Sequence, residues 1–135
     1  NYIEARMGKS IQVDTTEANA HCGLEKDFLS AGEGHIPTSK LLSAPWIWTR
    51  SQDQAEEVSW LSWMDVSVTA EMATTILGEN KEKEIIVYCG AGGYACPVYY
   101  ILAEQLRYKN VKFYDGSMQE WTADPYAPVV KYKYE

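Results

Sequence analysis

The second half of the chain alternates between short apolar runs and stripes of apolar residues at helical spacing. Residues 84–88 (EIIVY) carry a continuous apolar run, which is typical of a strand that a parallel sheet buries on both faces. From residue 95 to 107 the apolar positions recur at helical spacing, and Pro97 is acceptable in the first turn of such a helix. Residues 111–114 (VKFY) predict another strand, and residues 115–121 (DGSMQEW) predict a turn followed by a short helix.

The first half of the chain has a weaker pattern. Residues 10–14 (SIQVD) predict a strand that ends in an acid, and residues 40–42 predict a second, shorter strand. Between them the chain is polar, and we expect residues 21–23 (His-Cys-Gly) to lie in a loop. We expect one or two helical turns over residues 25–30, and a turn over residues 32–37 (GEGHIP), where Gly and Pro interrupt regular structure.

A helix is predicted over residues 68–77, with either Ser67 or Thr69 capping its start. Strands that alternate with helices imply an α/β fold with a parallel sheet. We therefore expect a central, mainly parallel sheet with helices on both faces. A chain of 135 residues is close to the usual size of one domain, so residues 1–135 are expected to form a single domain.

Composition and charge exclude several classes of protein. Hydrophobic residues make up 46% and charged residues 23%, which is ordinary for a soluble globular chain and excludes general disorder. No apolar run reaches the roughly 18 residues that a membrane span needs. Twelve basic and nineteen acidic residues give a net charge of −7, which disfavours nucleic acids and anionic membrane surfaces as partners. The compartment stays open between the cytoplasm and the periplasm or cell envelope.

The candidate chemistry lies in the loop after the buried strand of residues 84–88. Cys89 begins this loop, and Gly90, Gly92 and Gly93 let the backbone curl so that successive N–H groups point inward. A helix that starts near Ala95 would aim its positive end at the same place, so we expect a thiol held partly as thiolate near neutral pH. The alternative is a buried structural cysteine beside a tight turn.

The sequence resembles a rhodanese-type sulfurtransferase domain. The resemblance is carried by EIIVYCGAGGYA, by YKNVKFYDGSMQEW, by the GHIP of residues 34–37 and by the opening strand that ends in Asp14. The tail ADPYAPV is similar to the end of the second domain in tandem thiosulfate or 3-mercaptopyruvate sulfurtransferases. The similarity of this tail therefore implies that the chain can be one domain of a longer or tandem protein.

The resemblance implies covalent sulfur transfer in which Cys89 becomes a persulfide and then passes its sulfur on. The loop that would bind the persulfide consists of Gly90, Ala91, Gly92, Gly93, Tyr94 and Ala95. The implied donors are thiosulfate, 3-mercaptopyruvate or a protein persulfide, and the implied acceptors are a thiol, cyanide or a protein sulfur carrier. The family implies no cofactor and no metal.

The loop also departs from the family pattern. Many rhodaneses carry Arg or Lys directly after the cysteine and often another Arg five residues on, where this chain has Gly90 and Tyr94. The uncharged loop is closer to mercaptopyruvate-type members, and the Arg often found after the opening acid is Thr16 here. A thiosulfate dianion would rely on backbone dipoles alone, so the donor stays open. The sixth residue after Cys89 is alanine, which removes the arginine that related phosphatases use to hold phosphate.

Because the loop lacks these cations, a second, non-catalytic function is also compatible with the sequence. A non-catalytic rhodanese module with a regulatory or scaffolding role would need no such cations, although the cysteine and glycines argue against it. Cys96 is interpreted as a packed core cysteine in preference to a resolving thiol, and His35 as a structural residue in preference to a base. His21 and Cys22 lack a second ligand pair at zinc-like spacing.

Two further groups of residues have predicted structural roles. Asp115 and Ser117 are expected to form a turn and to cap the short helix that ends at Trp121. Four tryptophans flank a polar stretch over residues 49–57 and either line a cleft or partner surface or pack the sheet edge; they are Trp46, Trp48, Trp60 and Trp63.

Overall fold

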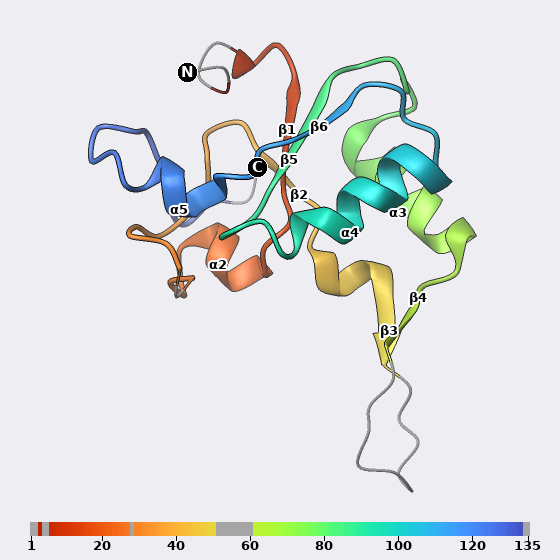
Figure 1. Ribbon diagram of the computed structural model, residues 1–135, viewed down its shortest axis with the longest axis horizontal. Helices are drawn as coiled ribbons and strands as arrows, with labels where there is room; N and C mark the ends of the chain where they lie inside the picture. Colours follow the sequence, from red (N-terminus) through yellow and green to blue (C-terminus); the bar gives the residue numbers. More distant parts are fainter. Residues whose placement is uncertain (1–2, 4–5, 28, 51–60, 134–135) are drawn as a thin grey trace, which may run out of the picture.

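The computed structural model describes residues 3, 6–27, 29–50 and 61–133, and its centre is a four-stranded parallel sheet (Figure 1). The strand order is β2-β1-β5-β6, and a separate two-stranded antiparallel pair joins β3 to β4. The strands are β1 (Ile11–Asp14), β2 (Lys40–Leu41), β3 (Trp48–Arg50), β4 (Leu61–Trp63), β5 (Ile85–Tyr88) and β6 (Val111–Phe113). The predicted α/β architecture with a parallel sheet is confirmed.

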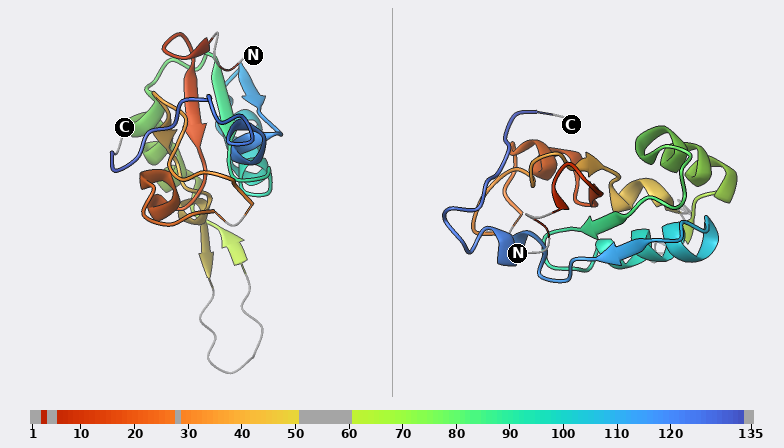
Figure 2. Two further views of the ribbon diagram at one scale, coloured as in Figure 1. Left: turned by 90° about the vertical axis from the view of Figure 1, so that its left-hand side faces the viewer. Right: turned by 90° about the horizontal axis from the view of Figure 1, so that it is seen from above.

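Helices cover both faces of the sheet, as predicted. In the left panel of Figure 2, α2 and α5 lie in front of the strands and α3 and α4 lie behind them. The helices are α2 (Ala18–Cys22), the 3-10 helix η1 (Ala44–Ile47), α3 (Val66–Leu77), α4 (Ala95–Tyr100), the π-helix η2 (Ile101–Gln105) and α5 (Ser117–Trp121). The helix expected over residues 95–107 is thus an α-helix that continues as a π-helix.

The central strand β5 is buried on both faces, and its side chains divide the core in two. Val87 points into a cluster with residues of α3, α4 and η2, such as Ala73 and Leu102. Ile86 and Tyr88 belong to a second cluster on the other face, which includes Trp121 of α5. This continuous burial is why the apolar run of β5 could be identified from the sequence.

A buried polar network holds the end of β1 to α2 and to the loop of residues 34–37. Asp14 accepts hydrogen bonds from the amide and hydroxyl of Thr16, and its other oxygen lies 2.8 Å from Nδ1 of His21. The ring of His21 stacks on that of His35 with centroids 3.7 Å apart, and His35 Nδ1 donates to the His21 carbonyl. Thr16 and His21 therefore satisfy the buried acid here, and His35 has a structural role.

Two local predictions in this region were wrong. His21 and Cys22 lie in α2, which Gly23 ends in a left-handed conformation (φ 80°), and only Gly23 is outside the helix. The described part of residues 25–30 contains no helical turn. The first error has a physical cause, because the buried residues of α2 are His21 and Cys22, and His21 contacts Asp14, so the helix leaves no apolar stripe in the sequence.

The start of α3 also differs from the prediction. The helix begins at Val66, and its N-cap is Asp65, whose carboxylate accepts the amide of Ser67 at 2.8 Å. Ser67 is thus the donor to the cap, and Thr69 instead bonds back to the Asp65 carbonyl. Asp is as good an N-cap as Ser, and only the backbone conformation decides which residue takes the position.

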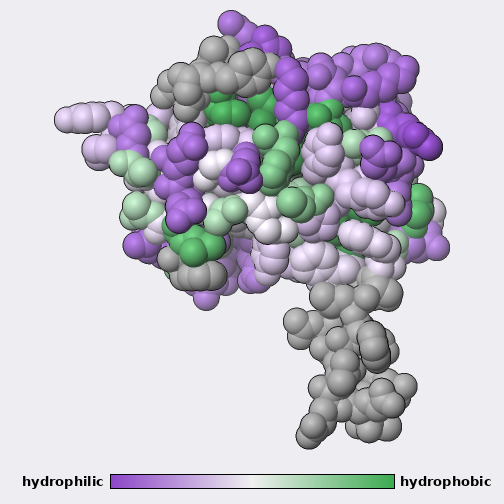
Figure 3. Space-filling view, in the orientation of Figure 1, coloured by the Kyte–Doolittle hydropathy of each residue, from purple (hydrophilic) through white to green (hydrophobic). Residues whose placement is uncertain are grey.

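The β3–β4 hairpin extends away from the sheet at the bottom of Figure 1. Trp48 pairs with Trp63 in its register, and Trp63 stacks on Tyr100 of α4 with ring centroids 6.0 Å apart. Figure 3 shows a weakly polar surface over α4 and the base of this hairpin, where the exposed aromatic residues Trp63 and Tyr100 meet. Most of the polar stretch at 49–57, together with Trp60, lies outside the described residues.

The Asp65 cap should make the stability of the protein depend on pH. Hydrogen bonds from the hydroxyl and amide of Ser67 hold the pKa of Asp65 below its usual 3.8. Because the folded pKa is the lower one, the stabilisation is complete above the unfolded value and is lost as the pH falls through the folded value. We predict that Asp65→Ala lowers the urea midpoint at pH 7 and that this difference narrows below pH 3.8.

Asp65→Asn provides the control, because Asn caps helices about as well as Asp without a titrating group. It should keep most of the stability at pH 7 and show a weaker acid dependence. An Asp65→Ala variant that unfolds at the same urea concentration as the parent at pH 7 would show that the cap is not formed in solution.

Candidate active site

Cys89 lies at the carboxyl edge of the sheet, directly after β5. Tyr88, the last residue of β5, is paired with Asp14 at the end of β1. Both the amide and the hydroxyl of Thr15 donate to the Tyr88 carbonyl at 2.9 Å. The ends of the two central strands are therefore joined one residue before the cysteine, at the edge where ligands bind in open α/β sheets.

The loop after Cys89 wraps around its sulfur. The Gly92 amide donates to Cys89 Sγ with the two atoms 2.8 Å apart, and Cys89 is only 2% exposed. Gly92 has a φ of +103°, a conformation that residues with side chains rarely adopt. Helix α4 begins at Ala95, immediately after this loop. The loop therefore directs at least one backbone donor at the sulfur.

Helix α5 supports the loop from behind. The amides of Met118 and Gln119 donate to the carbonyls of Cys89 and Gly90, each at 2.9 Å. Ser117, which is fully buried, accepts the Cys89 amide with its hydroxyl oxygen at 3.1 Å and donates to the Tyr114 carbonyl at 2.8 Å. Residues that follow β6 in the chain thus hold the backbone of the cysteine loop.

The predicted cap of α5 was wrong as a result. The N-cap position is Gly116, and no side chain caps the helix. Ser117 uses its hydroxyl to hold Cys89 instead, so the sequence analysis identified the residue but not its role. The Asp115 carboxylate lies near Gly92, 3.2 Å from the position that a Cβ would take there. The DGS motif therefore belongs to the candidate site.

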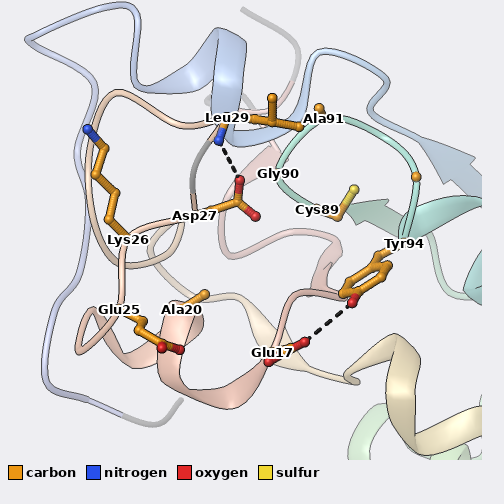
Figure 4. A pocket seen from close by; sticks show the side chains of 11 residues that line it. Glu17, Ala20, Glu25, Lys26, Asp27, Leu29, Cys89, Gly90, Ala91 and Tyr94 are labelled. Carbon is orange, nitrogen blue, oxygen red and sulfur yellow. Dashed lines mark hydrogen bonds between the residues drawn. The ribbon is translucent and has the colours of Figure 1, made fainter.

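A cavity of about 440 Å³ opens over the cysteine (Figure 4). Of the predicted site residues, Cys89, Gly90, Ala91, Gly93 and Tyr94 line it, whereas Gly92 and Ala95 do not. The opposite wall comes from α2 and the segment after it, and consists of Glu17, Ala20, Glu25, Lys26, Asp27 and Leu29. None of these six residues was predicted to belong to the site, because the stretch lacks a recognisable motif.

The Asp27 carboxylate lies directly against Gly90. A Cβ built on Gly90 would lie 2.5 Å from Oδ2 of Asp27, well inside any contact distance. The Asp27 carboxylate is held in place by the Leu29 amide, which donates to its other oxygen at 2.9 Å. An acidic side chain therefore packs against the position where many rhodaneses carry a cation.

Tyr94 lies at another side of the opening. Its hydroxyl donates to the Glu17 carboxylate at 3.3 Å, and its ring meets that of Trp48 edge-on with centroids 5.8 Å apart. Tyr94 is 37% exposed. The contact joins the cysteine loop to the start of α2 and to the hairpin, so one of the four tryptophans supports a residue of the cavity wall.

The other two cysteines differ in their surroundings. Cys22 is buried in α2, but Cys96 is exposed, so its interpretation as a packed core cysteine was wrong. Within the part of the chain that the structure describes, no three His, Cys, Asp or Glu side chains are grouped to hold a metal ion. No helix among these residues is both long and apolar enough to cross a membrane.

The fold and the site together define an α/β domain with a cysteine in a glycine loop at the carboxyl edge of its sheet. The chain belongs to the rhodanese-like domain family, because the sequence model of that family matches residues 3–124. This assignment confirms the resemblance that the cysteine loop and the GHIP and DGS motifs indicated.

The relatives include enzymes named for sulfur transfer. The thiosulfate sulfurtransferase of Pseudomonas aeruginosa is 27% identical over 95% of this chain and 43% of its own length. The sulfur carrier protein TtuD of Thermus thermophilus is 30% identical over 96% of this chain and 44% of its own length. This chain thus spans about two fifths of the length of these curated relatives.

Solved structures share the fold at lower sequence identity. The Tum1 protein of Saccharomyces cerevisiae superimposes with a TM-score of 0.70 and 22% identity, over 97% of this chain and 43% of Tum1. The anaerobic ergothioneine biosynthesis enzyme of Chlorobium limicola, solved with trimethyl histidine, gives 0.76 and 17%, over 96% of this chain and 30% of that enzyme. At these identities the likeness establishes the fold.

The loop geometry predicts opposite results for two neighbouring glycines. Gly92→Ala should lower the free energy of unfolding by about 1–3 kcal/mol, because alanine is strained at a φ of +103° and the strain displaces the amide that contacts Cys89. Gly93→Ala should change it by less than about 0.5 kcal/mol, since nothing lies within 4 Å of its added Cβ. Urea unfolding measures both, and equal losses in the two variants would contradict the loop conformation.

Proposed function

We propose that this protein is a sulfurtransferase that moves a sulfane sulfur from a donor to a thiophilic acceptor through a persulfide on Cys89. The observation that carries the proposal is the contact between the Gly92 amide and Cys89 Sγ at the edge of an open cavity. A structural cysteine would need neither the positive-φ glycine nor the cavity. Membership of the rhodanese-like family and relatives named thiosulfate sulfurtransferase support the same function.

The chemistry takes two steps. The Cys89 thiolate attacks the sulfane sulfur of the donor, and the donor's bond to that sulfur breaks with its electron pair going to the leaving group. Sulfite leaves from thiosulfate, and the enolate of pyruvate leaves from 3-mercaptopyruvate and is then protonated. In the second step an acceptor attacks the outer sulfur of the persulfide, and the Cys89 thiolate is released.

In this mechanism the loop stabilises the negative charge on the sulfur. The amide of Gly92 stabilises the thiolate before transfer and after it, and we propose that residues 90–95 surround the outer sulfur of the persulfide. The hydroxyl of Ser117 and the amides at the start of α5 keep the loop backbone in the same position through both steps. No metal or cofactor enters the reaction.

The second candidate is a non-catalytic rhodanese module, which the acidic wall of the cavity favours. Among the described residues that line the cavity, three carboxylates accompany a single lysine, and this set does not attract thiosulfate. A relay between proteins is a variant of the first proposal, in which docking contacts replace recognition of a small anion. The relative named as a sulfur carrier protein supports that variant.

Intact-protein mass spectrometry distinguishes these functions. After reduced protein is incubated with thiosulfate or with 3-mercaptopyruvate, we predict a gain of one sulfur atom that a reductant removes. Cys89→Ser should gain none, because it lacks the nucleophile. Cys96→Ser is the matched control and should gain sulfur as the parent does, since Cys96 is an exposed thiol outside the lining of the cavity.

Folded protein with a free Cys89 that gains no sulfur from either donor or from a protein persulfide would exclude sulfur transfer. The regulatory or scaffolding module would then be the better description. A sulfur gain that persists in Cys89→Ser but disappears in Cys96→Ser would show that Cys96 carries the sulfur and would contradict the proposed role of Cys89.

A further inference from the structure

The sulfur of Cys89 and the cavity above it have surroundings of different electrostatic character. On one side, the loop directs the Gly92 amide toward the sulfur. On the other side, the carboxylates of Glu17, Glu25 and Asp27 face the same space. The sulfur to be transferred and the remainder of the molecule that carries it therefore meet different fields.

Two of these three carboxylates are held by hydrogen bonds. Asp27 accepts the Leu29 amide at 2.9 Å and packs against the backbone of Gly90, so its charge lies next to the cysteine loop. Glu17 accepts the Tyr94 hydroxyl at 3.3 Å. The acidic wall is thus connected to the candidate site at two points and is more than a solvated surface near it.

Lys26 is the basic residue among the described lining residues, and it does not neutralise this wall. In Figure 4 its side chain points away from Cys89, whereas Asp27 lies between the two. Its charge also reaches Glu33, whose pKa is lowered chiefly by the hydrogen bond and charge contact with Lys131 and to a smaller extent by Lys26. The net field at the outer wall is therefore that of the carboxylates.

We propose that the small thiol that takes sulfur from Cys89 carries a positively charged group, as an aminothiol does, and that this group faces Glu17, Glu25 and Asp27. The inference rests on the sulfurtransfer proposed above. An acceptor attacks as a thiolate, which the three carboxylates repel, and an ammonium group on the same molecule reverses this effect. A cavity of about 440 Å³ is in the range that binds small molecules.

The transfer itself needs no further reactant. The acceptor thiolate attacks the outer sulfur of the Cys89 persulfide and forms a new S–S bond. The old S–S bond breaks, and its electron pair stays on Cys89 as the thiolate. The product is a persulfide of the aminothiol, so the oxidation level of the sulfur pair passes unchanged from protein to acceptor.

Single-turnover discharge of loaded protein tests the charge preference. Cys89 is first loaded with sulfur from inorganic polysulfide, excess reagent is removed, and mass spectrometry verifies the persulfide. The loaded protein is then mixed separately with cysteamine, 2-mercaptoethanol and mercaptoacetate, which are small thiols with a positive, neutral and negative substituent. Each rate is compared between the parent and a Glu17→Gln/Glu25→Gln double variant, so that the intrinsic reactivity of each thiol cancels.

We expect the double variant to discharge about two- to fivefold more slowly with cysteamine, somewhat faster with 2-mercaptoethanol, whose thiolate the carboxylates repel, and faster still with mercaptoacetate, as moderate screened charges would produce. Glutamine at position 17 can still accept the Tyr94 hydroxyl, so the wall keeps its shape. Glu79→Gln is the matched control, because Glu79 is exposed in the turn after α3 and lies outside the cavity lining. It should leave all three rates unchanged.

The parent protein provides a second test that needs no variant. Raising the salt concentration should reduce its cysteamine rate and raise its mercaptoacetate rate, because salt screens the carboxylates. If the persulfide forms but the three thiols respond alike to the double substitution and to salt, charge selection is wrong while sulfurtransfer stands. If polysulfide leaves no persulfide on Cys89, the proposed function itself fails, and this inference fails with it.

Discussion

The candidate site depends on the pairing of β5 with β1. Parallel pairing brings the carboxyl ends of the two strands to one edge, and the carbonyl of Tyr88 is bonded twice by Thr15 at the point where both strands end. Cys89 follows at once, so its position is set by the sheet and not by a flexible loop. Burial of β5 on both faces makes this pairing costly to disrupt, because both core clusters contain side chains of this strand.

The space around Cys89 is organised by segments distant in sequence. Helix α5 bonds the backbone of Cys89 and Gly90, and Ser117 holds the cysteine amide. The segment after α2 places Asp27 against Gly90 on the opposite side. The loop is therefore held between α5 and the segment after α2, and two of its glycines have different roles. Gly92 allows the chain to turn, whereas Gly90 leaves space for the Asp27 carboxylate.

This placement of Asp27 connects the uncharged loop to the character of the cavity. A Cβ at position 90 would overlap the Asp27 carboxylate as it lies here, so a side chain after the cysteine would require that acid to move. The site keeps a backbone donor for sulfur while its outer wall disfavours anions. In the function proposed above, chemistry at the sulfur and recognition of the molecule that carries it would be separated in space.

The sequence by itself determined the features that depend on local pattern. The apolar run of β5, the helical stripe of α4 and η2 and the glycines after Cys89 each follow from the burial or backbone freedom of neighbouring residues, and the family motifs indicated the candidate site. Most of the sheet and the position of Cys89 at its edge could be predicted in this way.

Only the tertiary structure decided the features built from polar contacts across the chain. Helix α2 owes its position to the contact of His21 with Asp14, and a polar helix face of this kind leaves no periodic signal. Asp65 replaced Ser67 as the cap because backbone geometry selects among equivalent residues. The carboxylates of the cavity wall lie near Cys89 because folding returns residues 17–27 to the edge of β5. The pattern of hydrophobic residues can be read from the sequence, whereas the hydrogen-bond partners of a polar side chain depend on which segments the fold brings together.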